Sequence, residues 1–185
     1  MNLPQGYVPL TLEHCAEYCR FLARTPRPTA DLTFTNLWGW AEYYGLGLSF
    51  RGDLCWICQT KPGLRFWAPV GDWENADWES HPEIRQGVEL LRVPHELADI
   101  LAQRLGPRVT MHDDRDQWEY LYDRDELATL PGAKFHKKKT HVNGFHKRYG
   151  EDYRRLDDPQ NHEGIEHVLE LQEKWCQWRD CENSP

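Results

Sequence analysis

The sequence has no long hydrophobic run: nothing in its 185 residues approaches the roughly 20 apolar residues that cross a bilayer. Its first ten residues, MNLPQGYVPL, lack the basic and apolar regions of a secretion signal. From both absences we expect a soluble, cytoplasmic protein whose six cysteines stay reduced. Nine Trp and a hydrophobic content of 39% argue against a disordered chain, and the length suits one domain, or one domain with a docking element.

Motifs of the common catalytic classes are also missing. The chain contains no Gly-x-Ser-x-Gly turn, no phosphate-cradling P-loop, and no Gly-rich turn before a helix of the kind that binds acetyl-CoA. The nine histidines include candidate bases, but none stands at a recognisable spacing from a nucleophile. The residues alone therefore assign no catalytic residue and no cofactor.

Cys55 and Cys58 have a spacing that invites a zinc or redox interpretation. Their stretch, DLCWICQT, is however typical of a β-strand, in which residues i and i+3 point to opposite faces. Neither of the other two cysteine pairs is a convincing second set of zinc ligands. We expect no metal site, and thiols that pack in the core as small apolar groups.

Two further clusters admit both a functional and a structural interpretation. In HDDRD, residues 112–116, the acids could form a carboxylate pair, but the adjacent Asp113 and Asp114 diverge on any regular backbone and suit the cap of a turn. Five tryptophans could line a ligand groove, although most large aromatic side chains belong to the core. They are Trp38, Trp40, Trp67, Trp73 and Trp78.

The order of elements predicts an α+β fold with a mixed sheet. Apolar residues at helical spacing predict helices over 11–23 and from about Asp31 to Gly45. Turn residues then separate three strands of a meander. These strands are expected at Leu46–Phe50, Leu54–Thr60 and Leu64–Ala68.

The rest of the chain alternates strands and helices. VELLRV, PRVTMH and WEYLYD are predicted as strands, and PHELADILAQRLG and RDELATL as helices. A final helix is expected to begin with Asp158 as its cap and Pro159 in its first turn. Apolar residues along this helix include Ile165, Val168 and Trp175.

One strongly basic stretch stands out in a chain with a net charge of −8. No Asp or Glu lies between Gly132 and Gly150, so the cations there are not neutralised by acids along the same helix. Basic side chains, histidines and Asn are donors of the kind that contact phosphate oxygens. The predicted phosphate-binding residues are Lys134, His136, Lys137, Lys138, Lys139, His141, Asn143, Lys147 and Arg148.

The same stretch predicts an amphipathic helix. Phe135, Val142, Phe145 and Tyr149 fall within one stripe roughly 80° wide. Lys138 points into this stripe, on the face that we expect to be buried, where it either snorkels to solvent or reaches a ligand. The alternative to an anion site is an ordinary solvated helix face.

The stretch WEYLYDRDELATLPGAKFHKKKTHVNGFHKRYG resembles the core of the phosphatidylglycerol lysyltransferase C-terminal domain family, especially its soluble members of uncharacterised function. LTFTNLWGW, FWAPVGDW and WCQWRDC also resemble that family. Thr140 departs from the pattern, because Asn is expected there. The resemblance implies a GNAT-like lobe, the first of two in tandem, over residues 1–157. Residues 158–185 would form a helix that links to a second lobe.

The resemblance implies transfer of an aminoacyl group from aminoacyl-tRNA, with the basic helix holding the tRNA acceptor end or another phosphate-bearing substrate. Two alternatives stay open: a stand-alone lobe that binds a polyanion or a protein without catalysis, and a module that binds anionic lipid. The last helix is expected to meet the second lobe, or another copy of the chain, through Trp175 and Trp178.

Overall fold

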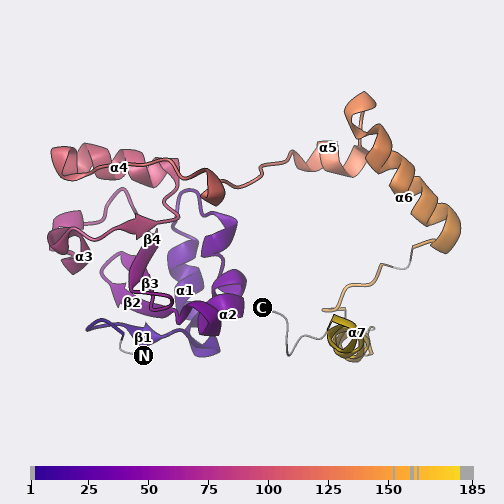
Figure 1. Ribbon diagram of the computed structural model, residues 1–185, viewed down its shortest axis with the longest axis horizontal. Helices are drawn as coiled ribbons and strands as arrows, with labels where there is room; N and C mark the ends of the chain where they lie inside the picture. Colours follow the sequence, from indigo (N-terminus) through magenta and orange to yellow (C-terminus); the bar gives the residue numbers. More distant parts are fainter. Residues whose placement is uncertain (1–2, 152, 159–160, 162, 180–185) are drawn as a thin grey trace. The chain divides into compact units, whose positions relative to one another are not determined.

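The computed structural model describes residues 3–151, 153–158, 161 and 163–179. By its internal contacts the chain divides into two compact units, Met1–Tyr120 and Leu121–Pro185. Each unit is described by itself (Figure 1). The first unit is shorter than the lobe predicted over 1–157, and the second contains more than the predicted linking helix. The link from residues 158–185 to a second lobe stays a prediction.

A five-stranded mixed sheet forms the centre of the first unit, in the order β1-β2-β3-β4-β5. Neighbouring strands are antiparallel from β1 to β4, whereas β4 and β5 are parallel and share two residue pairs, Phe66 with Leu90 and Trp67 with Leu91. The strands are β1 Val8–Pro9, β2 Gly47–Arg51, β3 Leu54–Gln59, β4 Arg65–Gly71 and β5 Leu90–Leu91. The predicted meander and the α+β class with a mixed sheet are thus confirmed.

Helices precede, connect and follow the strands of this unit. The α-helices are α1 Cys15–Leu22, α2 Phe34–Tyr44, α3 Pro82–Gln86 and α4 His95–Leu105. Short 3-10 turns are η1 Leu12–His14, η2 Ala30–Leu32, η3 Trp78–Ser80, η4 Gly106–Arg108 and η5 Arg115–Gln117. Gly45 ends α2 in a left-handed conformation, with φ of 59°, as a glycine after a helix commonly does.

The core of the first unit lies on β2, β3 and β4 and is rich in large aromatic side chains. Trp56, Trp67 and Trp73 are fully buried, and each indole N–H has an acceptor. Cys55 and Cys58 are buried in the same core, as predicted from the strand pattern. Burial raises the pKa of both thiols, that of Cys58 to about 12.

A polar network crosses this core. The Trp56 indole donates to Nδ1 of the buried His81 at 3.1 Å. Glu83, also buried, accepts from the Tyr7 hydroxyl at 2.7 Å and pairs with Arg51. These bonds connect the segment before β1, the strands β2 and β3, and the start of α3, so the network fixes three separate parts of the chain against one another.

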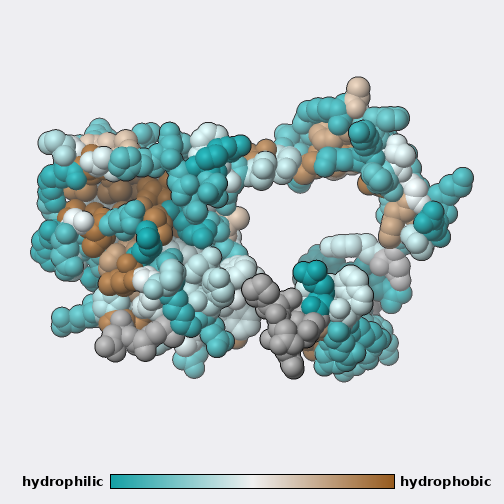
Figure 2. All heavy atoms as spheres, viewed as in Figure 1, coloured by the Kyte–Doolittle hydropathy of each residue, from teal (hydrophilic) through white to brown (hydrophobic). Residues whose placement is uncertain are grey.

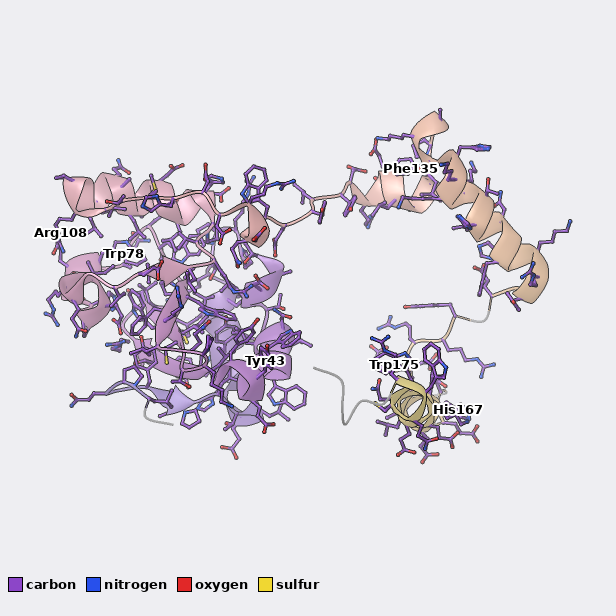
Figure 3. All side chains as sticks on the ribbon, in the orientation of Figure 1. Tyr43, Trp78, Arg108, Phe135, His167 and Trp175 are labelled. Carbon is purple, nitrogen blue, oxygen red and sulfur yellow. The ribbon has the colours of Figure 1, made fainter. Side chains whose placement is uncertain are left out.

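The second unit contains helices and little core. Its elements are α5 Arg124–Thr129, η6 Ala133–Phe135, α6 His136–Tyr149 and α7 Gly164–Arg179. Among its described residues only Phe135, labelled in Figure 3, and Gly164 are buried. Large apolar side chains of α6 and α7 are instead exposed, and Figure 2 shows apolar atoms among hydrophilic ones on the surface of these helices.

Three predictions of secondary structure were wrong. PRVTMH and WEYLYD form no strand, and neither segment belongs to the described five-stranded sheet. The last helix begins at Gly164 rather than at its predicted start, and the predicted first-turn Pro159 lies outside the described residues. The strand β1 was not predicted, since two residues are too few to show an alternating pattern.

Candidate anion-binding helix

The basic stretch forms the helix that its apolar spacing predicted. Gly132, with φ of 73°, turns the chain into η6, and α6 continues from His136 to Tyr149. Gly150, with φ of 71°, ends the helix, a backbone conformation that side-chain-bearing residues rarely adopt. Gly150 therefore ends α6, which is 14 residues long.

All nine predicted phosphate-binding residues lie on this helix or in the turn before it, and all are exposed. Lys134 has a partner, because its ammonium group contacts both carboxylate oxygens of Glu126 at 2.7 and 2.8 Å. Among the described residues, no acid pairs with Lys137, Lys138, Lys139 or Lys147. These four lysines carry positive charge that the described structure leaves uncompensated.

The cations flank an exposed apolar stripe. At 100° per residue, Lys139 and Lys147 lie on one side of the stripe of Val142, Phe145 and Tyr149, whereas Lys137 and Arg148 lie on the other. Thr140 and Gly144 lie between the two groups of cations, opposite the stripe, and no atom would meet a Cβ at Gly144 within 4 Å. An elongated anion could therefore approach the backbone of α6 closely, with positive charge on both sides.

The expectation that Lys138 lies on a buried face was wrong. Lys138 is exposed, and so are Val142, Phe145 and Tyr149 beside it. The helical pattern placed Lys138 on the apolar side, but the second unit provides no described element that covers this side. Lys138 consequently adds its charge to the exposed cations of α6 instead of snorkelling out of a core.

The structure also shows what the other two candidate clusters are: HDDRD contains a turn cap, and the five tryptophans are partly in the core and partly exposed. Asp114 accepts the backbone N–H of Asp116 at 3.1 Å and caps η5, so the turn interpretation of HDDRD is confirmed for this residue. Trp67, Trp73 and Trp78 belong to the core, whereas Trp38 and Trp40 are exposed on α2. The sequence interpretation left open whether the five tryptophans line a groove or fill the core, and the structure divides them between core and surface.

The described residues show no metal centre, and the hydroxyl–imidazole contact among them, Thr11 Oγ1 with His14 Nδ1 at 3.1 Å, belongs to the capping box of η1. No group of three or more potential metal ligands comes together in them. Cys55 and Cys58 are buried, and the hydrogen bond of Cys55 goes to the carbonyl of Trp56. Among the same residues, no helix combines the length and the apolar character that a membrane crossing needs.

The comparison with protein families shows to which family the chain belongs. Residues 22–184 match the model of the family "phosphatidylglycerol lysyltransferase, C-terminal". The chain therefore has a mixed-sheet α+β fold, and it belongs to the phosphatidylglycerol lysyltransferase C-terminal family. The predicted family membership is confirmed. No curated protein matches the chain.

One solved structure is similar over almost all of the chain. It is a conserved protein of unknown function from Bacteroides thetaiotaomicron VPI-5482, 25% identical, with a TM-score of 0.73. The match covers 99% of this chain but 62% of the Bacteroides chain. The present chain therefore spans less than two thirds of the length of that structural relative.

Proposed function

We propose that this chain is the donor-binding part of an aminoacyltransferase, in which α6 holds the phosphates of an aminoacyl-tRNA. The observation that carries the proposal is the set of four exposed lysines on α6 without an acidic partner among the described residues. The rest of this chain is strongly acidic, so a random surface would not collect these charges on one helix. Membership of the phosphatidylglycerol lysyltransferase C-terminal family supports the reaction class.

The reaction moves an aminoacyl group from the ribose ester of tRNA to an acceptor amine or hydroxyl. The acceptor atom attacks the ester carbonyl, the bond from the carbonyl carbon to the ribose oxygen breaks, and the proton of the acceptor passes to that ribose oxygen. Binding the acceptor end of the tRNA would hold the ester in place for this attack, which reduces the entropic part of the barrier. The described residues assign no general base and no oxyanion donors, so α6 is given a binding role alone.

Binding of aminoacyl-tRNA tests this proposal. Replacing Lys137, Lys139 and Lys147 with Gln should weaken binding about tenfold or more, without lowering thermal stability, because these side chains are exposed. A matched variant changes three other exposed cations, Arg20→Gln, Arg85→Gln and Lys174→Gln, and removes the same net charge. Equal weakening by both variants would show that only the overall charge matters, and it would refute a site on α6.

A second function is favoured because the hydroxyl–imidazole contact that the described residues show, Thr11 with His14, serves as a helix cap. The chain would then bind a polyanion without catalysis. Transfer of a labelled amino acid to any acceptor by the purified chain would exclude this alternative. Tight tRNA binding without transfer, over a panel of amine and lipid acceptors, would favour it.

A further inference from the structure

A hollow on the surface of the first unit has no part in the proposed function. It has a volume of about 350 Å³ and is formed by η2 and the first part of α2. Its lining combines one large aromatic side chain, Trp40, with the polar side chains of Thr35 and Asn36. None of the described residues that line it is Lys or Arg, so the hollow lacks the fixed positive charge that α6 offers to a phosphate.

Trp40 forms a flat and firmly held wall of this hollow. The side chain is 49% exposed, and Tyr43 and Tyr44 pack against its ring at centroid distances of 5.6 and 6.0 Å. Tyr44 in turn contacts the buried Trp67 at 5.7 Å. These aromatic contacts anchor the exposed ring to the core, so a ligand that stacks on it has little side-chain freedom to remove.

Gly39 keeps the space beside Trp40 open. It stands in the interior of α2, where glycine destabilises a helix relative to alanine. The backbone does not require a glycine there, because Gly39 is helical and has no positive φ. Packing does not require it either, since a Cβ at this position would meet no atom within 4 Å. The missing methyl group instead leaves room for a ligand ring next to Trp40.

Polar groups with free hydrogen-bonding capacity adjoin this space. Within the described residues, the Thr35 hydroxyl, the Asn36 amide oxygen and the Trp40 indole N–H take part in no hydrogen bond. Asp31 also lines the hollow, but it pairs with Arg92 and accepts from the Asn36 amide at 3.2 Å, so its charge is compensated. The hollow therefore presents donors and acceptors without a net charge.

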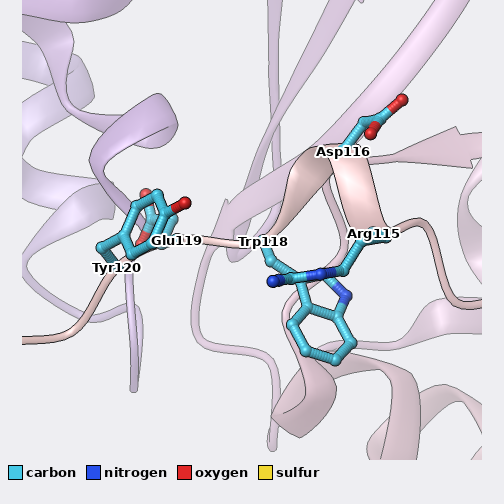
Figure 4. A pocket seen from close by; sticks show the side chains of 5 residues that line it. All are labelled: Arg115, Asp116, Trp118, Glu119 and Tyr120. Atoms are coloured by element: carbon cyan, nitrogen blue, oxygen red, sulfur yellow. The ribbon is translucent and has the colours of Figure 1, made fainter.

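One edge of the hollow is bounded by the segment that ends the first unit, residues 115–120 (Figure 4). The backbone N–H of Ala30, in the lining of the hollow, donates to the carboxylate of Glu119. Arg115 is accompanied in this segment by Asp116 and Glu119, so the segment is acidic in balance. The surroundings thus disfavour an anion, and the lining itself favours a neutral ligand with hydroxyl groups.

We propose that this hollow binds a neutral sugar ring, with the C–H face of a pyranose stacked on Trp40 above Gly39 and its hydroxyl groups bonded to Thr35 and Asn36. The C–H bonds on that face carry partial positive charge and pack on the negative face of an indole ring. Sugar hydroxyls both donate and accept, which matches the groups that the hollow leaves free. The ligand is a saccharide or a sugar-bearing molecule, and the site does not depend on the proposed function of α6.

Fluorine NMR of the whole chain labelled with fluorotryptophan tests the site at the level of single side chains. The probes are the methyl β-glycosides of glucose, galactose and N-acetylglucosamine, with choline and inorganic phosphate as charged comparisons. At least one glycoside should shift the Trp40 resonance saturably and leave the Trp38 resonance in place. Trp38 is the matched control, because it is similarly exposed, at 51%, on the same helix but does not line the hollow. Trp40→Phe and Trp38→Phe assign the two resonances.

Gly39→Ala separates binding from folding. The added methyl group would occupy the space beside Trp40 and should weaken binding of the glycoside about tenfold or more. Thermal stability should stay equal or rise in the same variant, because alanine favours the helix. The α6 variant Lys137→Gln/Lys139→Gln/Lys147→Gln should bind the glycoside as the wild type does.

A Trp40 resonance that none of the glycosides shifts would overturn the site, and so would wild-type affinity in Gly39→Ala. A shift caused by choline or phosphate alone would assign the hollow to a charged ligand and contradict the proposal. The proposed function of α6 fails separately: wild-type binding of tRNA by the α6 variant would remove that function and leave the sugar site in place.

Discussion

Both units of this chain contain tryptophan and other large apolar residues, but the two units differ in how far these side chains are buried. The first unit places Trp56, Trp67 and Trp73 in a core, where each of these fully buried indoles has a hydrogen-bond acceptor. The helices of the second unit also carry large apolar side chains, yet Trp175, Trp178 and the apolar side chains before them on α7 are exposed. An apolar stripe thus predicts a helix and the face that it offers for packing, but it does not predict what covers that face.

A comparison of buried and exposed tryptophan should show the largest effect. Trp56→Ala removes a fully buried ring and leaves His81 without its donor, so we expect a loss of about 3–5 kcal/mol in the free energy of unfolding. Trp178→Ala, at 80% exposure in the second unit, should change it by less than about 0.5 kcal/mol. Urea unfolding followed by circular dichroism measures both; similar losses would contradict the division into a packed and an unpacked unit.

The contribution of an ion pair in the first unit to the free energy of unfolding should likewise increase with its burial. Arg51→Met leaves the buried Glu83 carboxylate without its cation and should cost roughly 3 kcal/mol, with Tyr7 as its remaining partner. Arg65→Met breaks an exposed pair with Glu89 and should cost at most about 1 kcal/mol. If the two variants unfold at the same urea concentration, the polar network does not contribute as described.

Self-association should distinguish the second unit from the first. Sedimentation velocity at rising concentration should show reversible association that Trp175→Glu/Trp178→Glu abolishes, because both rings are exposed on the apolar side of α7. Val8→Glu changes an exposed apolar residue of the first unit and should have no effect. A wild-type chain that remains monomeric at high concentration would contradict this prediction.

A smaller, pH-dependent effect should come from His81. Burial, followed by the nearby Arg51, lowers its pKa, and the Trp56 bond requires Nδ1 to be unprotonated. The unfolded chain therefore binds the proton more readily, so stability is complete above about pH 6.5 and falls as the pH drops toward the folded-state pKa. His81→Gln should lower stability at pH 7.5 and flatten this dependence between pH 7 and 5. An unchanged slope would assign the acid sensitivity to other groups.

Much of the secondary structure of the first unit could be predicted from local sequence patterns. The Gly and Pro turns located β2, β3 and β4 because antiparallel neighbours are joined by short turns that the sequence shows directly. The strand predicted in WEYLYD failed because alternation gives a strand its faces but not a neighbouring strand, and the described five-stranded sheet does not include this segment. The charge pattern located the cations of α6, whereas the surface at Trp40 required tertiary structure to separate exposed from buried tryptophan.

Salt dependence of tRNA binding tests the central claim, that α6 holds phosphate, most directly. Each phosphate contact contributes roughly 0.7–0.9 to the slope of log affinity against log salt concentration. Replacing Lys137, Lys139 and Lys147 with Gln should make that slope less steep by about two to three, while the control variant at Arg20, Arg85 and Lys174 keeps the wild-type slope. Identical slopes for the wild type and the α6 variant would show that these lysines do not contact the phosphates of the bound tRNA.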